Sequence, residues 1–134
     1  MGTKVFVNLS VKDLEKSKEF FSKLGFTFNS QFTNENAACM VIGEDNYAML
    51  LVEPFFKTFT KKEIVDAKKS TEVLVALSAE SKVKVDEMLA KALAAGAKEA
   101  REPQDHGFMY GRSLEDLDGH IWEIFWMDPK AINQ

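Results

Sequence analysis

The sequence predicts an α+β fold made of two copies of one βαβββ unit. Residues 7–10 (Val-Asn-Leu-Ser) reappear as residues 75–78 (Val-Ala-Leu-Ser), and each copy ends a short apolar run. In both halves an amphipathic, helix-like stretch follows and stops at a glycine. A polar corner and an apolar run then match again, with residues 44–51 opposite residues 116–123. A chain built from two copies of one unit often places its binding cleft between them, so we expect the chemistry there.

The first unit is predicted over about residues 5–53. It opens with a β-branched, apolar strand over residues 5–11. Asp13 is a good N-cap, and apolar residues at helical spacing then predict a helix that stops at Gly25. Alternating or apolar runs separated by turn residues predict three more strands, at 26–32, 37–42 and 47–52.

Residues 54–70 are predicted to be a linker between the units. Pro54 cannot continue a central strand, because it has no backbone N–H to donate. The run Thr-Lys-Lys-Glu at residues 60–63 has the form of a capping box. It predicts a short helix that reaches Lys69.

The second unit is predicted over about residues 71–126 and repeats the same order of elements. A strand over 72–77 leads to a helix that Ser81 caps and Gly96 ends. Three strands complete the unit, at 98–102, 108–114 and 121–126, the first two separated by a turn over 103–107.

Composition excludes several classes of protein. The 134 residues predict one domain, and a content of 46% hydrophobic and 28% charged residues is ordinary for a soluble globular protein. A net charge of −4 argues against a nucleic-acid partner, and no apolar run approaches the roughly 20 residues that span a membrane. Cys39 is the only cysteine, which excludes an intrachain disulfide and favours a cytoplasmic location.

Three segments resemble the vicinal oxygen chelate superfamily, which includes glyoxalase I, extradiol dioxygenases, and fosfomycin- and bleomycin-resistance proteins. They are residues 8–14, 20–26 and 116–123, although Leu117 stands where the family corner usually has proline. The resemblance covers nearly the whole chain, residues 1–134. It implies a single glyoxalase-like domain in which two βαβββ modules form an open barrel-like mixed sheet around a cavity. It also implies a homodimer.

Metal-using members of that superfamily take one ligand from the first strand and one from the last strand of each module. Matching the motifs and the internal repeat places these positions at Phe6, Leu51, Leu74 and Glu123. Three of the four side chains have no lone pair for a cation, and one carboxylate alone does not hold a divalent ion. We therefore expect a degenerate site and no metal or other cofactor.

If the predicted ligand positions are shifted by two residues along the strands, a second candidate metal site appears. Asn8 and Glu53 share the faces of Phe6 and Leu51, so Asn8, Glu53 and Glu123 could form a displaced site. The second unit offers nothing at Leu74 or Ala76 to complete it.

Glu123 is the candidate catalytic residue. Its neighbours are apolar, and we expect the strand to be buried on both faces, where an unpaired carboxylate is costly. Either it acts as a general base or it forms an ion pair inside the cavity. Arg112 is the expected partner, and it alternates with Tyr110 along one strand. That strand face either borders the cavity or lies outside it.

Two functional hypotheses remain. In the first, the chain binds a small, largely apolar or aromatic molecule without a metal. In the alternative, it is a lactoylglutathione-lyase-like or dioxygenase-like enzyme with displaced ligands or with Glu123 as base. A dimeric interaction module with a filled cavity is a third possibility. The residues expected to line the ligand pocket are Phe6, Asn8, Leu51, Glu53, Leu74, Tyr110, Arg112 and Phe125.

Overall fold

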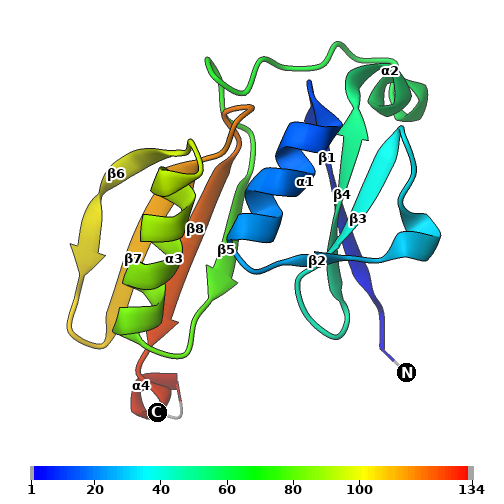
Figure 1. Cartoon of the computed structure of the whole chain (residues 1–134). Coiled ribbons are helices and arrows are strands. Elements are labelled where there is room, and N and C mark those ends of the chain that lie inside the picture. The colour runs from blue at the N-terminus through cyan, green and yellow to red at the C-terminus, as the bar shows by residue number, and fades with distance from the viewer. Residues whose placement is uncertain (1, 133–134) are drawn as a thin grey trace. The chain divides into compact units, whose positions relative to one another are not determined.

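The computed structural model describes residues 2–132, which form two compact units divided between Val65 and Asp66. Each unit contains a four-stranded mixed sheet with a helix over one face (Figure 1). The strand orders are β1-β4-β3-β2 and β5-β8-β7-β6, and the first and last strands of each unit run parallel. The predicted pair of βαβββ modules is therefore confirmed. Among the described residues, the hydrogen-bonded strands form two four-stranded sheets rather than one continuous sheet.

The first unit forms because one face of its sheet is apolar and meets an amphipathic helix. Its elements are β1 (Val5–Val11), α1 (Leu14–Lys23), β2 (Thr27–Phe28), β3 (Ala37–Val41) and β4 (Asn46–Val52). The Asp13 side chain accepts a hydrogen bond from the Lys16 backbone N–H and so caps α1. Phe20 and Phe21 of α1 are each 2% exposed, so the helix buries its apolar face.

The strand predicted over 26–32 is wrong beyond residue 28. β2 contains only two residues, and a 3-10 helix, η1 (Ser30–Phe32), follows it. The Asn29 side chain accepts from the Gln31 N–H, which offers the backbone an alternative to strand pairing. Alternation of apolar residues alone could not show this competition.

The helix predicted from Thr60 to Lys69 is also wrong. The chain instead turns into α2 (Glu53–Phe56) and the 3-10 helix η2 (Lys57–Phe59) directly after β4. Pro54 lies in the first turn of α2, where its missing N–H costs nothing. Thr60 accepts from the Lys62 N–H and so forms a local turn rather than a cap.

The second unit comprises β5 (Leu74–Ser78), α3 (Lys82–Ala94), β6 (Lys98–Asp105), β7 (Met109–Glu115), β8 (Ile121–Met127) and the short α4 (Pro129–Ile132). Ser81 caps α3 by accepting from the Lys84 N–H. The core of this unit lies between α3 and the sheet. Its most buried side chains are Val85, Leu89, Leu114, Trp122 and Ile124. Among residues 2–132, no helix combines the length and apolar character that crossing a lipid bilayer requires.

The internal repeat is real, but one predicted equivalence is wrong by two residues. Phe6 pairs with Tyr47, and Leu74 pairs with Ile121. If Phe6 is equivalent to Leu74, the residue equivalent to Glu123 is therefore Met49 and not Leu51. The turns agree, because the Ile42 N–H donates to the Asn46 carbonyl just as the Asp116 N–H donates to the His120 carbonyl.

The corner before β8 is held by a buried carboxylate. Asp116 is 8% exposed and accepts from the backbone N–H groups of Asp118 and His120 and from the Trp122 indole at 2.9 Å. Burial raises the pKa of this carboxyl, while its N–H donors act in the opposite direction. The corner also needs Gly119, whose φ is +96°. A Cβ there would lie 2.7 Å from the Lys68 backbone nitrogen.

We predict that Gly119→Ala lowers the free energy of unfolding by about 3 kcal/mol, since it combines a left-handed backbone with a backbone clash. Gly107→Ala is the matched control, because Gly107 has φ +80° and open space around its Cα. It should cost only about 1–2 kcal/mol. Urea denaturation of both variants measures the difference. Equal losses would mean that the contact with Lys68 does not constrain the corner.

Candidate functional site

The sheet of the second unit has one face covered by α3 and one face that α3 leaves open. Trp122 and Ile124 of β8 are buried on the α3 side, and alternation places Glu123 and Phe125 on the open face. The expectation that β8 is buried on both faces is wrong, because the Glu123 side chain is 30% exposed. This open face holds the candidate site.

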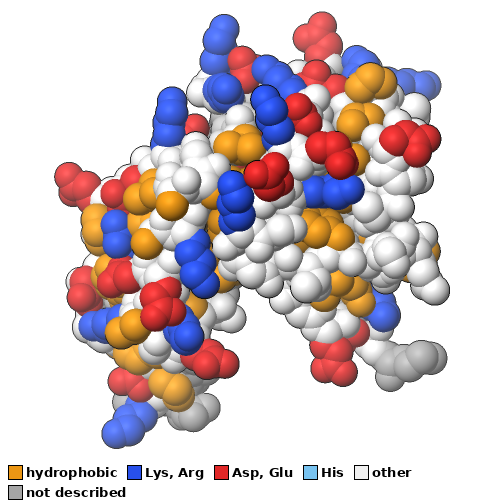
Figure 2. Space-filling model, viewed as in Figure 1, with side chains coloured by type: hydrophobic (Ala, Val, Ile, Leu, Met, Phe, Trp, Pro, Cys, Tyr) orange, Lys and Arg blue, Asp and Glu red, His pale blue; other side chains and the backbone are white. Residues whose placement is uncertain are grey.

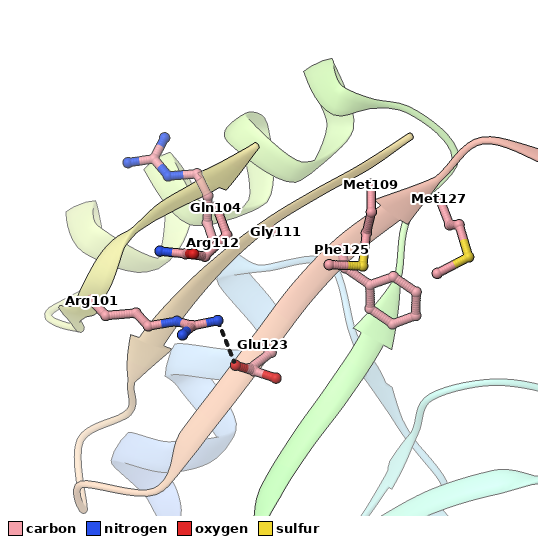
Figure 3. Close-up of a pocket in the computed structure, with 8 residues that line it drawn as sticks. All are labelled: Arg101, Gln104, Met109, Gly111, Arg112, Glu123, Phe125 and Met127. Carbon is pink, nitrogen blue, oxygen red and sulfur yellow. Dashed lines mark ion pairs between the residues drawn. The ribbon is translucent and has the colours of Figure 1, made fainter. Parts of the chain in front are cut away.

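A pocket of about 270 Å³ lies on the open face over β6, β7 and β8 (Figure 3). Its lining residues are Arg101, Gln104, Met109, Gly111, Arg112, Glu123, Phe125 and Met127. Met109 pairs across the strands with Met127, and Gly111 pairs with Phe125. Apolar side chains thus occupy one end of the pocket, and Arg101 and Glu123 occupy the other.

Gly111 gives the pocket its depth. It has no side chain at the point where β7 lies beneath the pocket, opposite Phe125 of β8. A Cβ added at Gly111 would lie 3.7 Å from the Phe125 Cβ, which is an ordinary contact. A larger side chain at this position would therefore fill the pocket without straining the backbone.

Glu123 forms an ion pair with Arg101, and Arg112 is not its partner. The Arg101 Nη2 and Glu123 Oε2 atoms are 3.8 Å apart (Figure 3). Arg101 comes from β6, so its side chain crosses β7 to reach β8. Within β7, Ser113 pairs with both Arg101 and Glu123, and the three residues form one row across the sheet.

Of the two β7 residues predicted to line the pocket, Arg112 lines it and Tyr110 does not. Arg112 borders the pocket, but its guanidinium group binds Asp86 of α3 at 3.0 Å and Glu99 at 2.9 Å. The Tyr110 hydroxyl donates to Asp86 at 2.6 Å, and this hydrogen bond is the main cause that lowers the pKa of Asp86. These groups tie α3 to the sheet.

The other predicted pocket residues do not converge in the second unit's pocket. Leu74 lies on the open face in β5 and is 55% exposed, but it does not line the pocket. The remaining four belong to the first unit, and their part in a ligand site stays a prediction. Phe6 stacks on Tyr47 at 4.7 Å, Asn8 donates to the Phe6 carbonyl, Leu51 is 1% exposed, and Glu53 begins α2.

Sequence reasoning missed Arg101, Gln104, Met109, Gly111 and Met127. This strand was expected to end at residue 102, but β6 continues through Pro103 to Asp105. An edge strand tolerates proline, because the missing N–H can face away from the neighbouring strand. Irregular pairing lies on both sides of Arg101. Glu99 and Arg101 therefore take opposite faces although they are two residues apart. Met127 could have been found, since it continues the alternation of Glu123 and Phe125.

The donor set does not fit the metal ion that the family resemblance implies. The corrected equivalence replaces Leu51 by Met49, whose thioether is a poor ligand for a hard cation. Phe6 and Leu74 offer no lone pair. Among the described residues, no three His, Cys, Asp or Glu side chains lie close enough to hold a metal. The displaced site of Asn8, Glu53 and Glu123 likewise contains only two carboxylates.

Comparisons with known proteins agree with this fold. The family described as bleomycin resistance protein-like N-terminal matches residues 3–43. A hypothetical protein from S. aureus is 28% identical, with a TM-score of 0.79 over 94% of this chain and 95% of its own. No curated protein sequence matches the chain significantly.

Two further structures share the fold at lower identity. A glyoxalase/bleomycin resistance protein/dioxygenase family enzyme from Burkholderia phytofirmans PsJN is 16% identical, with a TM-score of 0.80 over 94% of this chain and 99% of its own. The fosfomycin resistance protein FosX from Mesorhizobium loti is 12% identical, with a TM-score of 0.69 over 99% and 98%. Together with the family match, these structures support the predicted resemblance to the vicinal oxygen chelate superfamily.

We predict that zinc, nickel or manganese will not raise the melting temperature of the purified protein. An ion that binds only the folded state must stabilise it, so a true site would give a shift that grows with ion concentration. Calorimetric melting with and without each ion makes the measurement. A saturable rise that Glu123→Gln removes would contradict the conclusion that the donor set is degenerate.

The two arginines near the pocket should differ in their effect on stability. Arg112→Gln removes hydrogen bonds to two carboxylates from a side chain that is 22% exposed, so we expect a loss of about 2 kcal/mol. Arg101→Gln removes one long ion pair from a side chain that is 60% exposed, and should change stability by less than about 0.5 kcal/mol. Denaturant unfolding compares them. Similar losses of unfolding free energy in the two variants would contradict the conclusion that Arg112 stabilises the fold.

Proposed function

We propose that this protein binds a small, largely apolar or aromatic molecule in the pocket over β6, β7 and β8, without a metal ion. The pocket itself carries the proposal, because it combines an apolar end with a few polar groups, as ligand sites do. Its volume of about 270 Å³ suits a ligand of one or two rings. A second copy of the chain remains a proposed partner from the family resemblance.

The apolar end is adapted to a flat ligand. Phe125 offers a ring face, and Met109 and Met127 offer flexible thioether side chains that adjust to the ligand's outline. Exposed apolar side chains in a hollow are energetically unfavourable in water, and a ligand that covers them gains the free energy of removing that surface from water.

Catalysis by Glu123 is the second candidate function. Its carboxylate lies in the pocket beside Phe125 and is partly shielded from water, as a general base requires. Glu123→Gln keeps the shape of the side chain and removes the base. A ligand that the wild-type protein converts, and that the variant binds without converting, would favour the enzyme over the binding protein.

We predict that Phe125→Ala weakens binding of neutral naphthol, a fluorescent aromatic probe, by about tenfold, because one aromatic contact contributes roughly 1.5 kcal/mol. Gly111→Leu should abolish binding by filling the pocket. Phe32→Ala is the control, since Phe32 is 61% exposed and belongs to the first unit. Near-ultraviolet circular dichroism checks that each variant is folded. Unchanged affinity in folded Gly111→Leu would show that the probe binds elsewhere.

A further inference from the structure

The row formed by Arg101, Ser113 and Glu123 has unequal ends. Glu123 lies on β8, an inner strand, and its side chain is 30% exposed. Arg101 lies on β6, the edge strand, and its long side chain is 60% exposed. Their separation of 3.8 Å is longer than a hydrogen bond. Arg101 can therefore turn into water at little cost, whereas the backbone of an inner strand fixes Glu123 in place.

Ser113 lies beneath this ion pair. Register places its side chain on the pocket face between Arg101 and Glu123. Its hydroxyl is buried and has no hydrogen-bond partner among the described residues. A buried hydroxyl without a partner is unfavourable, and native structures rarely retain one without a reason. If the Arg101 side chain moved away, the Ser113 oxygen would become available to accept a hydrogen bond from a ligand.

The sign of the ligand's charge follows from these differences. An anion would draw Arg101 from Glu123 and leave the carboxylate unpaired beside a second negative charge. A cation would replace Arg101 at Glu123 and release the guanidinium to water. The other pocket arginine, Arg112, is already paired with Asp86 and Glu99 and does not compete. The Phe125 ring adds attraction, because aromatic faces bind cations.

We infer that the pocket selects an apolar or aromatic ammonium ion, whose charged nitrogen displaces Arg101 and donates hydrogen bonds to Glu123 and Ser113. Arg101 then competes with the ligand for the Glu123 carboxylate and pairs with it when no ligand is bound. This inference rests on the proposed binding function and adds the charge class of the ligand to it. Ser113 and Glu123 become the residues that determine specificity.

The test compares two probes of one shape and opposite charge, naphthylmethylammonium and naphthoate, by titration calorimetry at neutral pH. We expect the wild-type protein to bind the ammonium about tenfold more tightly, the effect of one charge-assisted hydrogen bond. Glu123→Gln should abolish this preference, because it removes the carboxylate that pairs with the ammonium group. Arg101→Gln should strengthen ammonium binding severalfold by removing the competitor. Lys98→Gln is its control, since Lys98 is an exposed cation of the same strand that does not line the pocket.

Ser113→Ala adds a readout that does not depend on net charge. It should weaken ammonium binding severalfold while leaving the free protein at least as stable, because it removes an unpartnered hydroxyl. Tighter binding of naphthoate, or weaker ammonium binding in Arg101→Gln, would overturn the inference and leave the proposed function standing. If naphthol and both charged probes all fail to bind, the proposed function falls as well.

Discussion

The hydrogen bond between the Trp122 indole and Asp116 sets the geometry of the second unit. It anchors the beginning of β8 to the corner before it and directs the Trp122 side chain into the core beneath α3. Because side chains alternate along a strand, this orientation also determines where Glu123 and Phe125 point. One buried contact on the α3 side therefore decides which residues line the pocket on the other side.

The same sheet separates two kinds of ionic group. On the α3 side, Arg112 is shared between two carboxylates at hydrogen-bonding distance and ties β6, β7 and α3 together. On the open side, Arg101 makes one long contact with Glu123. The number and length of the contacts distinguish an arginine that serves the fold from one that is free to exchange partners. Figure 2 shows Lys and Arg interspersed with Asp and Glu over the visible face, so neither sign of charge dominates there.

The fold was largely predictable because its elements are encoded locally. Asp13 and Ser81 cap their helices, and the repeated motifs mark both units. The site was less predictable because it depends on register. Glu123 and Phe125 were identified from the last strand alone, whereas Arg101 required knowledge of two irregularities in β6 that no local pattern reveals. The predicted equivalence of Leu51 and Glu123 in the repeat failed for a related reason. A shift of two residues leaves each side chain on the same face of the sheet, so the alternation of apolar and polar residues cannot reveal it.

The irregular edge strand has a consequence for the protein's behaviour in concentrated solution. An exposed edge of regular backbone N–H and C=O groups is a template on which another chain can add a strand, and such additions can grow into aggregates. In β6 the register shifts interrupt that template, and Pro103 removes one of its donors. The distortion that turns Arg101 toward the pocket thus also protects the molecule against edge-to-edge association.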